Sequence, residues 1–226
     1  MNRQTSLLLH LLLLVIVVVE LTGRISGNIL LEYPVKPLIM LWMATYFLLH
    51  HRKQELTRPV LIAFFFSWTG DILLMFSERN ELFFFAGVGG FFLAQLTYIY
   101  IFTRFSEHGG KGYLQKNLIV GFLFIGYVAG IFYLLNPGLE GLMKPVLLIY
   151  ALSLIGMSMM ALNRKDRVNS RSYLLVFIGS VIFVLSDSMI ALDKFYRDIP
   201  LAGFLIMLTY ISAQYLIMRG LLLERE

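Results

Sequence analysis

Two aspartates stand inside long apolar stretches of this chain. Asp71 lies in the segment 64–76, which is otherwise rich in Phe, Leu and Ile, and Asp187 lies in the similar segment 181–195. A charge at that depth in a membrane helix costs roughly 2.5–3.5 kcal/mol on insertion scales, and such carboxylates usually mark a pathway or a reaction centre. Two carboxyl groups in different surroundings can act as acid and base in one reaction. The alternative interpretation is a structural ion pair of each aspartate with a lysine.

Seven further polar residues could support the two aspartates. Two lysines, each followed by proline, begin apolar segments, and they could form ion pairs with the aspartates or share one polar pocket with them. A serine four residues before Asp71 would lie on the same helix face. Two glutamines and two tyrosines on other segments could bind a polar head group or hydrogen-bond neighbouring helices. These residues are Lys36, Lys144, Ser67, Gln95, Tyr98, Tyr210 and Gln214.

The elements that must position these residues are membrane helices. The 226 residues are 58% hydrophobic and only 15% charged, with a mean hydropathy of +0.76, whereas soluble domains carry about 25% charged residues. Apolar segments of about 20 residues predict helices, because lipid offers no partner for free backbone groups. We therefore expect an all-α, multi-pass integral membrane protein that forms a single membrane domain over residues 1–226.

The hydropathy pattern predicts eight membrane-spanning helices, at about residues 6–21, 36–49, 59–76, 82–102, 118–135, 143–162, 173–192 and 201–223. With eight spans, most of the 19 Lys and Arg residues fall on the side of the N-terminus, including clusters at 52–58, 104–116 and 164–171. The positive-inside rule then places both termini in the cytoplasm, and the membrane of a bacterium would be the inner one. A seven-span arrangement would break this alternation.

The two halves of the chain share anchors in the same order. A Lys-Pro pair, an intramembrane Asp and an Ala-Gln pair recur, which predicts a duplication with halves at about 1–104 and 113–226. Four spans in each half predict a parallel repeat about an axis near the membrane normal. In this arrangement both aspartates and both lysines lie in one layer toward the outer side of the membrane.

Metal and nucleic-acid chemistry is not favoured by the composition. Cysteine is absent, which excludes disulfides and cysteine-ligated metal sites. The four histidines, at positions 10, 50, 51 and 108, lie away from the expected aspartate layer and show no HExxH spacing. We expect neither metal nor cofactor, and we interpret the net charge of +5 as membrane orientation rather than nucleic-acid binding.

The motifs around both aspartates resemble those of the YhhN family, the lysoplasmalogenases of bacteria and animals. The resemblance rests on residues 70–74 (GDILL), on 186–191 (SDSMIA) followed by Lys194-Phe195, on 210–214 (YISAQ), and on the Lys-Pro pair of the second span. Each motif is short, but together they extend over nearly the whole chain. The family often carries a histidine where this chain has Gln95, a departure that bears on activity and substrate choice.

This resemblance implies hydrolysis of the vinyl ether of a lysoplasmalogen, a single-chain ether lysophospholipid, to a fatty aldehyde and a glycerophospho-ethanolamine or -choline. Protonation of the vinyl ether and addition of water require a proton donor and a group that stabilises the cation and activates water, without a metal. Asp71 and Asp187 are the expected catalytic pair, and nearby lysines could bind the lipid phosphate. The alternative is a small-molecule or lipid transporter that uses intramembrane Asp and Lys pairs.

Overall fold

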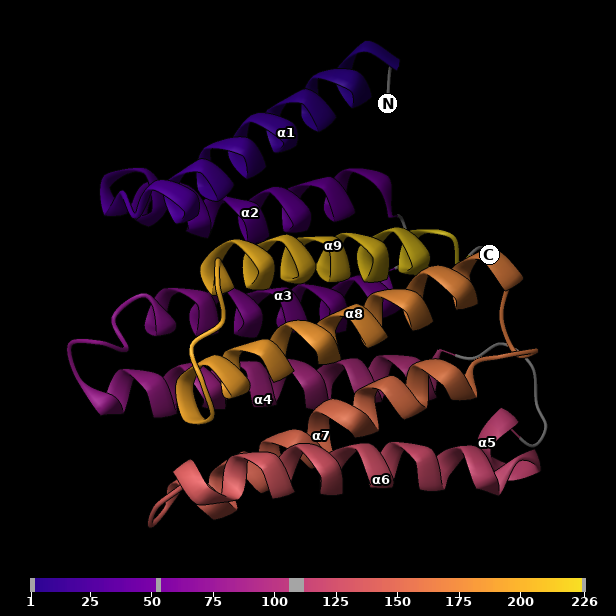
Figure 1. Ribbon diagram of the computed structural model, residues 1–226. Coiled ribbons are helices and arrows are strands. Elements are labelled where there is room, and N and C mark those ends of the chain that lie inside the picture. Colours follow the sequence, from indigo (N-terminus) through magenta and orange to yellow (C-terminus); the bar gives the residue numbers. More distant parts are fainter. Residues whose placement is uncertain (1–2, 52–53, 106–111, 225–226) are drawn as a thin grey trace. The chain divides into compact units, whose positions relative to one another are not determined.

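The computed structural model describes residues 3–51, 54–105 and 112–224, and every regular element in these ranges is helical (Figure 1). The all-α prediction is therefore confirmed for the described chain. Parts of the basic clusters at 52–58 and 104–116, and His108 with them, lie outside the described residues. The elements are α1 (Arg3–Ser26), α2 (Ile29–His50), α3 (Gln54–Leu74), α4 (Glu81–Arg104), α5 (Tyr113–Lys116), α6 (Leu118–Leu135), the 3₁₀ turn η1 (Asn136–Gly138), α7 (Met143–Asn163), α8 (Ser170–Phe195) and α9 (Ala202–Leu222).

Seven of the helices in the described ranges are long and apolar enough to cross a membrane, namely α1, α3, α4, α6, α7, α8 and α9. The chain is thus a multi-pass membrane protein. The remaining expected span coincides with α2, which has 22 residues but is not among the described helices that meet the length and composition of a membrane span. Its charged residues Glu32 and Lys36 and its prolines Pro34 and Pro37 lower its hydropathy.

Helix α2 begins earlier than the sequence pattern predicts. Asn28 is its N-cap, and the side chain of Asn28 accepts a hydrogen bond from the Leu30 backbone N–H at 3.0 Å, a preferred way to begin a helix. The pattern predicts that the Lys-Pro pair opens this span, because proline favours the first helical turn. That prediction is wrong, since Lys36 lies about two turns inside α2.

The chain divides into two compact units, Met1–Tyr98 and Ile99–Glu226, which we describe one at a time. In the first unit α1 packs against α2, and α2 packs against α3. Its core is formed by apolar side chains with almost no exposed surface, including Met43, Phe47, Val60, Ala63, Phe64 and Ala94. This core fixes the depth of the polar residues that α2 and α3 carry.

In the second unit α8 and α9 form the most closely packed pair of helices, and α7 packs on both α6 and α8 (Figure 1). A Cβ atom at Gly179 would lie 2.9 Å from the carbonyl oxygen of Ala213 and 3.0 Å from the backbone nitrogen of Ile217. Small residues let membrane helices approach this closely. The α8–α9 contact therefore depends on glycine at this position.

A similar glycine contact joins α3 and α4 in the first unit. A Cβ atom at Gly90 would lie 3.0 Å from the backbone nitrogen of Gly70 and 3.1 Å from the carbonyl oxygen of Phe66. Gly70 immediately precedes Asp71, so the close approach of the two helices also sets the position of that carboxyl group. At Gly89, the neighbour of Gly90, a Cβ atom would meet no other element of the described chain within 4 Å.

We expect the Gly90→Ala variant to be less stable than the wild type. The added methyl group meets the backbone of α3 rather than a flexible side chain, and overpacking of this kind costs about 1–3 kcal/mol. The measurement is the apparent Tm of the purified protein in detergent. Gly89→Ala is the matched control, and its Tm should stay the same or rise, because alanine favours a helix over glycine by roughly 0.5–1 kcal/mol. An equal fall in both variants would contradict the close α3–α4 contact.

Candidate functional site

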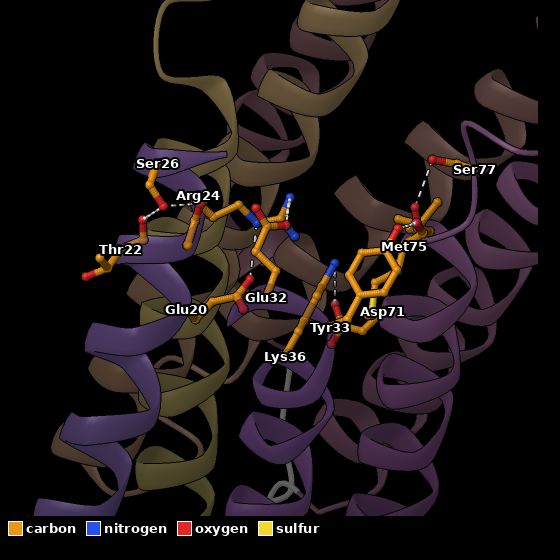
Figure 2. Close-up of polar contacts among 12 residues, drawn as sticks. Glu20, Thr22, Arg24, Ser26, Glu32, Tyr33, Lys36, Asp71, Met75 and Ser77 are labelled. Carbon is orange, nitrogen blue, oxygen red and sulfur yellow. Dashed lines mark hydrogen bonds and ion pairs between the residues drawn. The ribbon is translucent and has the colours of Figure 1, made fainter. Parts of the chain in front are cut away.

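A network of ion pairs joins the end of α1, the beginning of α2 and the end of α3 (Figure 2). The Arg24 Nε–H donates to Glu20 Oε1 at 3.1 Å, and Arg24 Nη1 lies 3.1 Å from Glu32 Oε2. Lys36 Nζ lies 3.8 Å from Asp71 Oδ1. The i,i+4 spacing of Glu20 and Arg24 places both on one face of α1. We call these five residues the charged network.

Four of the five residues of the charged network are buried, and Arg24 is partly exposed. The exposed fraction is 3% for Asp71 and 7% for Lys36, and Glu20 is fully buried. Buried charges are tolerated when they are paired and hydrogen-bonded. The network holds three carboxyl groups and two basic groups, and Glu20 Oε2 has no hydrogen-bond partner within the described parts of the chain. It can therefore be neutralised by one proton or by a positively charged group of a ligand.

Two hydrogen bonds on either side of the Lys36–Asp71 pair fix α2 against α3. The indole Nε1–H of Trp68, three residues before Asp71, donates to the carbonyl of Pro37 at 3.1 Å. The Tyr33 hydroxyl donates to the carbonyl of Met75 at 3.1 Å, just beyond the end of α3. Because both bonds act across the same two helices, they keep the lysine facing the carboxylate.

The other residues of the first unit that the sequence singled out are also buried. Ser67, Gln95 and Tyr98 have no exposed surface. Ser67 lies one turn before Asp71 on α3 and so shares its helix face, whereas Gln95 and Tyr98 lie on α4. Burial of this kind suits helix–helix hydrogen bonding as well as ligand binding.

In the second unit Asp187 has a different partner. Its Oδ2 accepts a hydrogen bond from the Tyr150 hydroxyl of α7, and the exposed fraction of Asp187 is 7%. The next residue, Ser188, donates to the Val184 carbonyl at 2.7 Å. The Tyr127 hydroxyl of α6, 2.7 Å from Ser188 Oγ, is then the donor to that oxygen. Side chains from α6, α7 and α8 thus converge around Asp187, and we call them the Asp187 group.

The predicted partner of Asp187 lies elsewhere. Lys144 is exposed in the first turn of α7, and within the described ranges no ion pair joins it to Asp187. A lysine at a helix start can extend its side chain to the membrane interface, so pairing with a buried carboxylate is not required. The expected Lys36–Asp71 pair is present, and in place of the expected Lys144 contact Asp187 has a hydrogen bond from Tyr150.

Helix α9 carries the last two predicted residues. Tyr210 and Gln214 are buried, and the Tyr210 ring packs edge-on against Phe183 of α8 with ring centres 5.7 Å apart. Ser186 Oγ donates to the Ile206 carbonyl of α9 at 3.0 Å. These contacts hold the part of α8 that bears Asp187 against α9.

Sequence reasoning missed several partners of the two aspartates. Glu20 and Arg24 had a visible signal, since their i,i+4 spacing is that of a helical ion pair. Tyr150 gave no such signal in the sequence, because a tyrosine in an apolar run is usually a packing residue. Glu32 was hidden in the segment that the pattern assigned to a loop before α2.

A second buried charge lies at the other end of the second unit. Arg164, just after α7, donates through Nη2 to Ser172 Oγ at 3.1 Å, forms an ion pair with Glu224, and lies over the Phe102 ring at 5.4 Å. Burial lowers the pKa of Arg164 to about 9. Ser172 is about four turns before Asp187 on α8, so these contacts hold the helix ends together far from the Asp187 group.

The described histidines, His10, His50 and His51, contact aromatic rings, and His10 and His50 also contact helix backbone carbonyls. His50 stacks on Tyr46 with ring centres 3.9 Å apart, and His51 Nδ1 lies 3.0 Å from Thr57 Oγ1. In the portion of the chain that the structure describes, no three His, Asp or Glu side chains are grouped so that they could hold a metal ion.

Comparison with known proteins assigns the family. The model of the YhhN family matches residues 31–221. The chain belongs to the YhhN family. The matched region contains Lys36, Asp71, Tyr150 and Asp187, so the resemblance drawn from the motifs is confirmed, while α1 with Glu20 and Arg24 precedes it.

Two curated relatives of this YhhN-family chain carry the name lysoplasmalogenase TMEM86A. The protein from Bos taurus is 28% identical over 198 residues, which cover 84% of this chain and 77% of the relative. The protein from Homo sapiens is 27% identical over 198 residues with the same coverage. No solved structure matches the chain.

Proposed function

We propose that this protein hydrolyses the vinyl ether bond of a lysoplasmalogen, releasing a fatty aldehyde and a glycerophospho-ethanolamine or -choline. The reaction class is supported by membership of the YhhN family and by relatives named lysoplasmalogenase over 84% of the chain. The observation that carries the proposal in this chain is the buried Lys36–Asp71 pair inside a network with more carboxyl groups than basic groups. Such a network can donate and accept a proton away from bulk water.

The proposed reaction uses acid–base chemistry. A carboxylic acid transfers its proton to the β-carbon of the vinyl ether, and the π electrons form the new C–H bond and leave an oxocarbenium ion. A carboxylate stabilises this cation and takes a proton from the attacking water. In the collapse of the hemiacetal, the carboxylate formed in the first step takes the hydroxyl proton, and the C–O bond to glycerol breaks as the other carboxyl, now protonated, gives its proton to the leaving glycerol oxygen; the aldehyde is released and both carboxyl groups return to their starting states. We assign the two carboxyl roles to Asp71 and Asp187, and no step requires a metal.

Supporting roles follow from the contacts of each side chain. Lys36 is engaged with Asp71, so we assign it the orientation and charge balance of that carboxylate. Tyr150 donates a hydrogen bond to Asp187, so we assign it the orientation of that carboxylate. Lys144, exposed at the start of α7, is our candidate for the lipid phosphate. For positioning the head group or the attacking water we propose Ser67, Gln95, Tyr98, Tyr210 and Gln214.

The proposed membrane arrangement has eight spans, namely the seven apolar helices and α2. Its 22 residues correspond to roughly 33 Å of helix rise, enough to cross the hydrocarbon core. We further propose that both termini are cytoplasmic and that residues 1–104 and 113–226 form a parallel repeat within a single membrane domain. The substrate, a single-chain lysophospholipid, then enters from the bilayer.

The second candidate function is transport of a lipid or small molecule. A buried ion pair in a membrane bundle, such as Lys36–Asp71, is also the kind of group that transporters use to bind and release protons or ions. In that case the pair would exchange partners during the transport cycle.

The decisive measurement is aldehyde release from a lysoplasmalogen by the purified protein in the presence of EDTA. We expect release to continue in EDTA, because the proposed acid–base steps need no metal. The ester lysophospholipid with the same chain is the control and should yield no aldehyde. If the wild type releases no aldehyde but moves lysolipid across the membrane of proteoliposomes, transport is the function.

A further inference from the structure

We propose that a cavity in the second unit binds the hydrocarbon chain of the single-chain lipid, an inference that rests on the proposed hydrolase function. The cavity has a volume of about 420 Å³ and lies between α6, α7 and α8. Except for Tyr113, Tyr127 and Ser158, the residues that line it are apolar. It thus offers an apolar groove, open along one side, for a ligand with a long hydrocarbon part.

The cavity is elongated along the helices. Its lining on α8 extends from Phe177 to Leu185, and its lining on α7 runs over the same level from Leu162 back to Ile155. The stretch on α8 is just over two turns of helix and corresponds to roughly 12 Å of rise. A cavity of this shape suits an extended chain better than a compact ligand.

One end of the cavity adjoins the Asp187 group. Tyr127 lines the cavity and donates to Ser188, the residue that follows Asp187. Val184 also lines the cavity, and its carbonyl accepts the Ser188 hydroxyl. Asp187 is therefore less than one turn beyond the lining. A chain in the cavity would present at this end the bond that joins it to the glycerol, and in a lysoplasmalogen that bond is the vinyl ether.

The opposite end is bounded by Tyr113, Leu162 and Phe177. The Lys165 ammonium lies over the Tyr113 ring, 4.4 Å from its centre, so this end is capped by an aromatic ring and a charge. Along the side, the lining residues Leu123 and Leu185 are 70% and 49% exposed. The apolar side gives a chain a lateral entry, and the capped end limits how long a chain can be held.

The binding test uses a palmitoyl lysophosphatidylethanolamine with a diazirine near the end of its chain. This lipid is an ester, so labelling reports binding without hydrolysis. After irradiation in nanodiscs, we expect mass spectrometry to find the label on peptides around Tyr113, Leu162 and Phe177. Val181→Trp fills the middle of the cavity and should reduce this labelling several-fold. Ile178→Trp is the matched control on α8, since Ile178 is exposed and does not line the cavity, and its labelling should equal that of the wild type.

The kinetic test compares lysoplasmalogens with a hexadecenyl and an octenyl chain. We expect Val181→Trp to lower the ratio of kcat/KM for the long over the short substrate about tenfold, because a few buried methylene groups are lost. Ile178→Trp should leave the ratio unchanged. Cavity labelling without aldehyde release would support the chain site and refute the hydrolase. Aldehyde release with an unchanged ratio in Val181→Trp, or labelling spread evenly over exposed apolar helices, would overturn the chain site and leave the hydrolase in place.

Discussion

The Asp71→Asn variant is expected to lose aldehyde release by about 10²–10⁴-fold in kcat, the usual contribution of a general acid or base. Asparagine is close in size to aspartate but can neither donate nor take up the proton that the reaction moves. It also leaves the buried Lys36 ammonium, 3.8 Å away in the wild type, without its counter-charge. The measurement is kcat with a lysoplasmalogen in nanodiscs.

A control separates chemistry from folding at this position. Breaking a buried ion pair by removing one partner costs about 3–5 kcal/mol, whereas replacing both partners is often neutral. The double variant Lys36→Met with Asp71→Asn should therefore recover much of the Tm that Asp71→Asn loses, while its aldehyde release stays absent. Recovery of activity together with stability would show that Asp71 is only the structural half of an ion pair.

The Asp187→Asn variant is expected to show a loss of similar size for a different reason. The asparagine carbonyl can still accept the Tyr150 hydroxyl, the contact that Asp187 makes in the structure, so the fold should be kept. The proton-transfer function is nevertheless removed, and kcat should fall by about 10²–10⁴-fold. Tyr150→Phe should give a smaller loss and a changed pH profile of kcat, because the carboxyl stays in place and loses its hydrogen-bond donor.

Asp193→Asn is the matched control on the same helix. Asp193 accepts the Ile199 backbone N–H at 2.7 Å through Oδ1, an acceptor role that asparagine retains, so its kcat should equal that of the wild type. Residues that act in the same reaction have strongly non-additive effects. The kcat of the double variant Asp71→Asn with Asp187→Asn should therefore be no lower than that of the less active single variant. Full activity in well-folded Asp187→Asn would remove this residue from the mechanism.

The helices and the two aspartates were predictable from the sequence for physical reasons. Long apolar runs must be helical in lipid, and a carboxylate within such a run is rare enough to be noticed. The beginning of α2 was not predictable in the same way. Two prolines lie inside the helix, and because proline is typical of a first helical turn they predict a later start. The Asn28 cap, at which the helix begins, is a weaker signal in an apolar sequence.

The partners of the aspartates were only partly predictable. Lys36 and Asp71 are of opposite charge and were expected at a similar depth, and the structure pairs them. The same reasoning for Lys144 and Asp187 did not give a pair, because the choice between a buried contact and the interface depends on how α7 packs. The packing of α7 brings the Tyr150 hydroxyl to Asp187. Nothing in the sequence around Tyr150 distinguishes it from the other aromatic residues of the chain.

Helix α6 has a consequence for handling the protein. Its buried residues are Val128 and Leu135, while Leu118, Phe122 and Leu123 are among its many exposed apolar side chains. We therefore expect lipid to contact this face of α6. Annular lipid then contributes to the stability of α6 in the second unit. Delipidation by a harsh detergent should loosen α6 before the glycine-packed α8–α9 pair, so bilayer thickness and acyl composition become determinants of how the protein behaves.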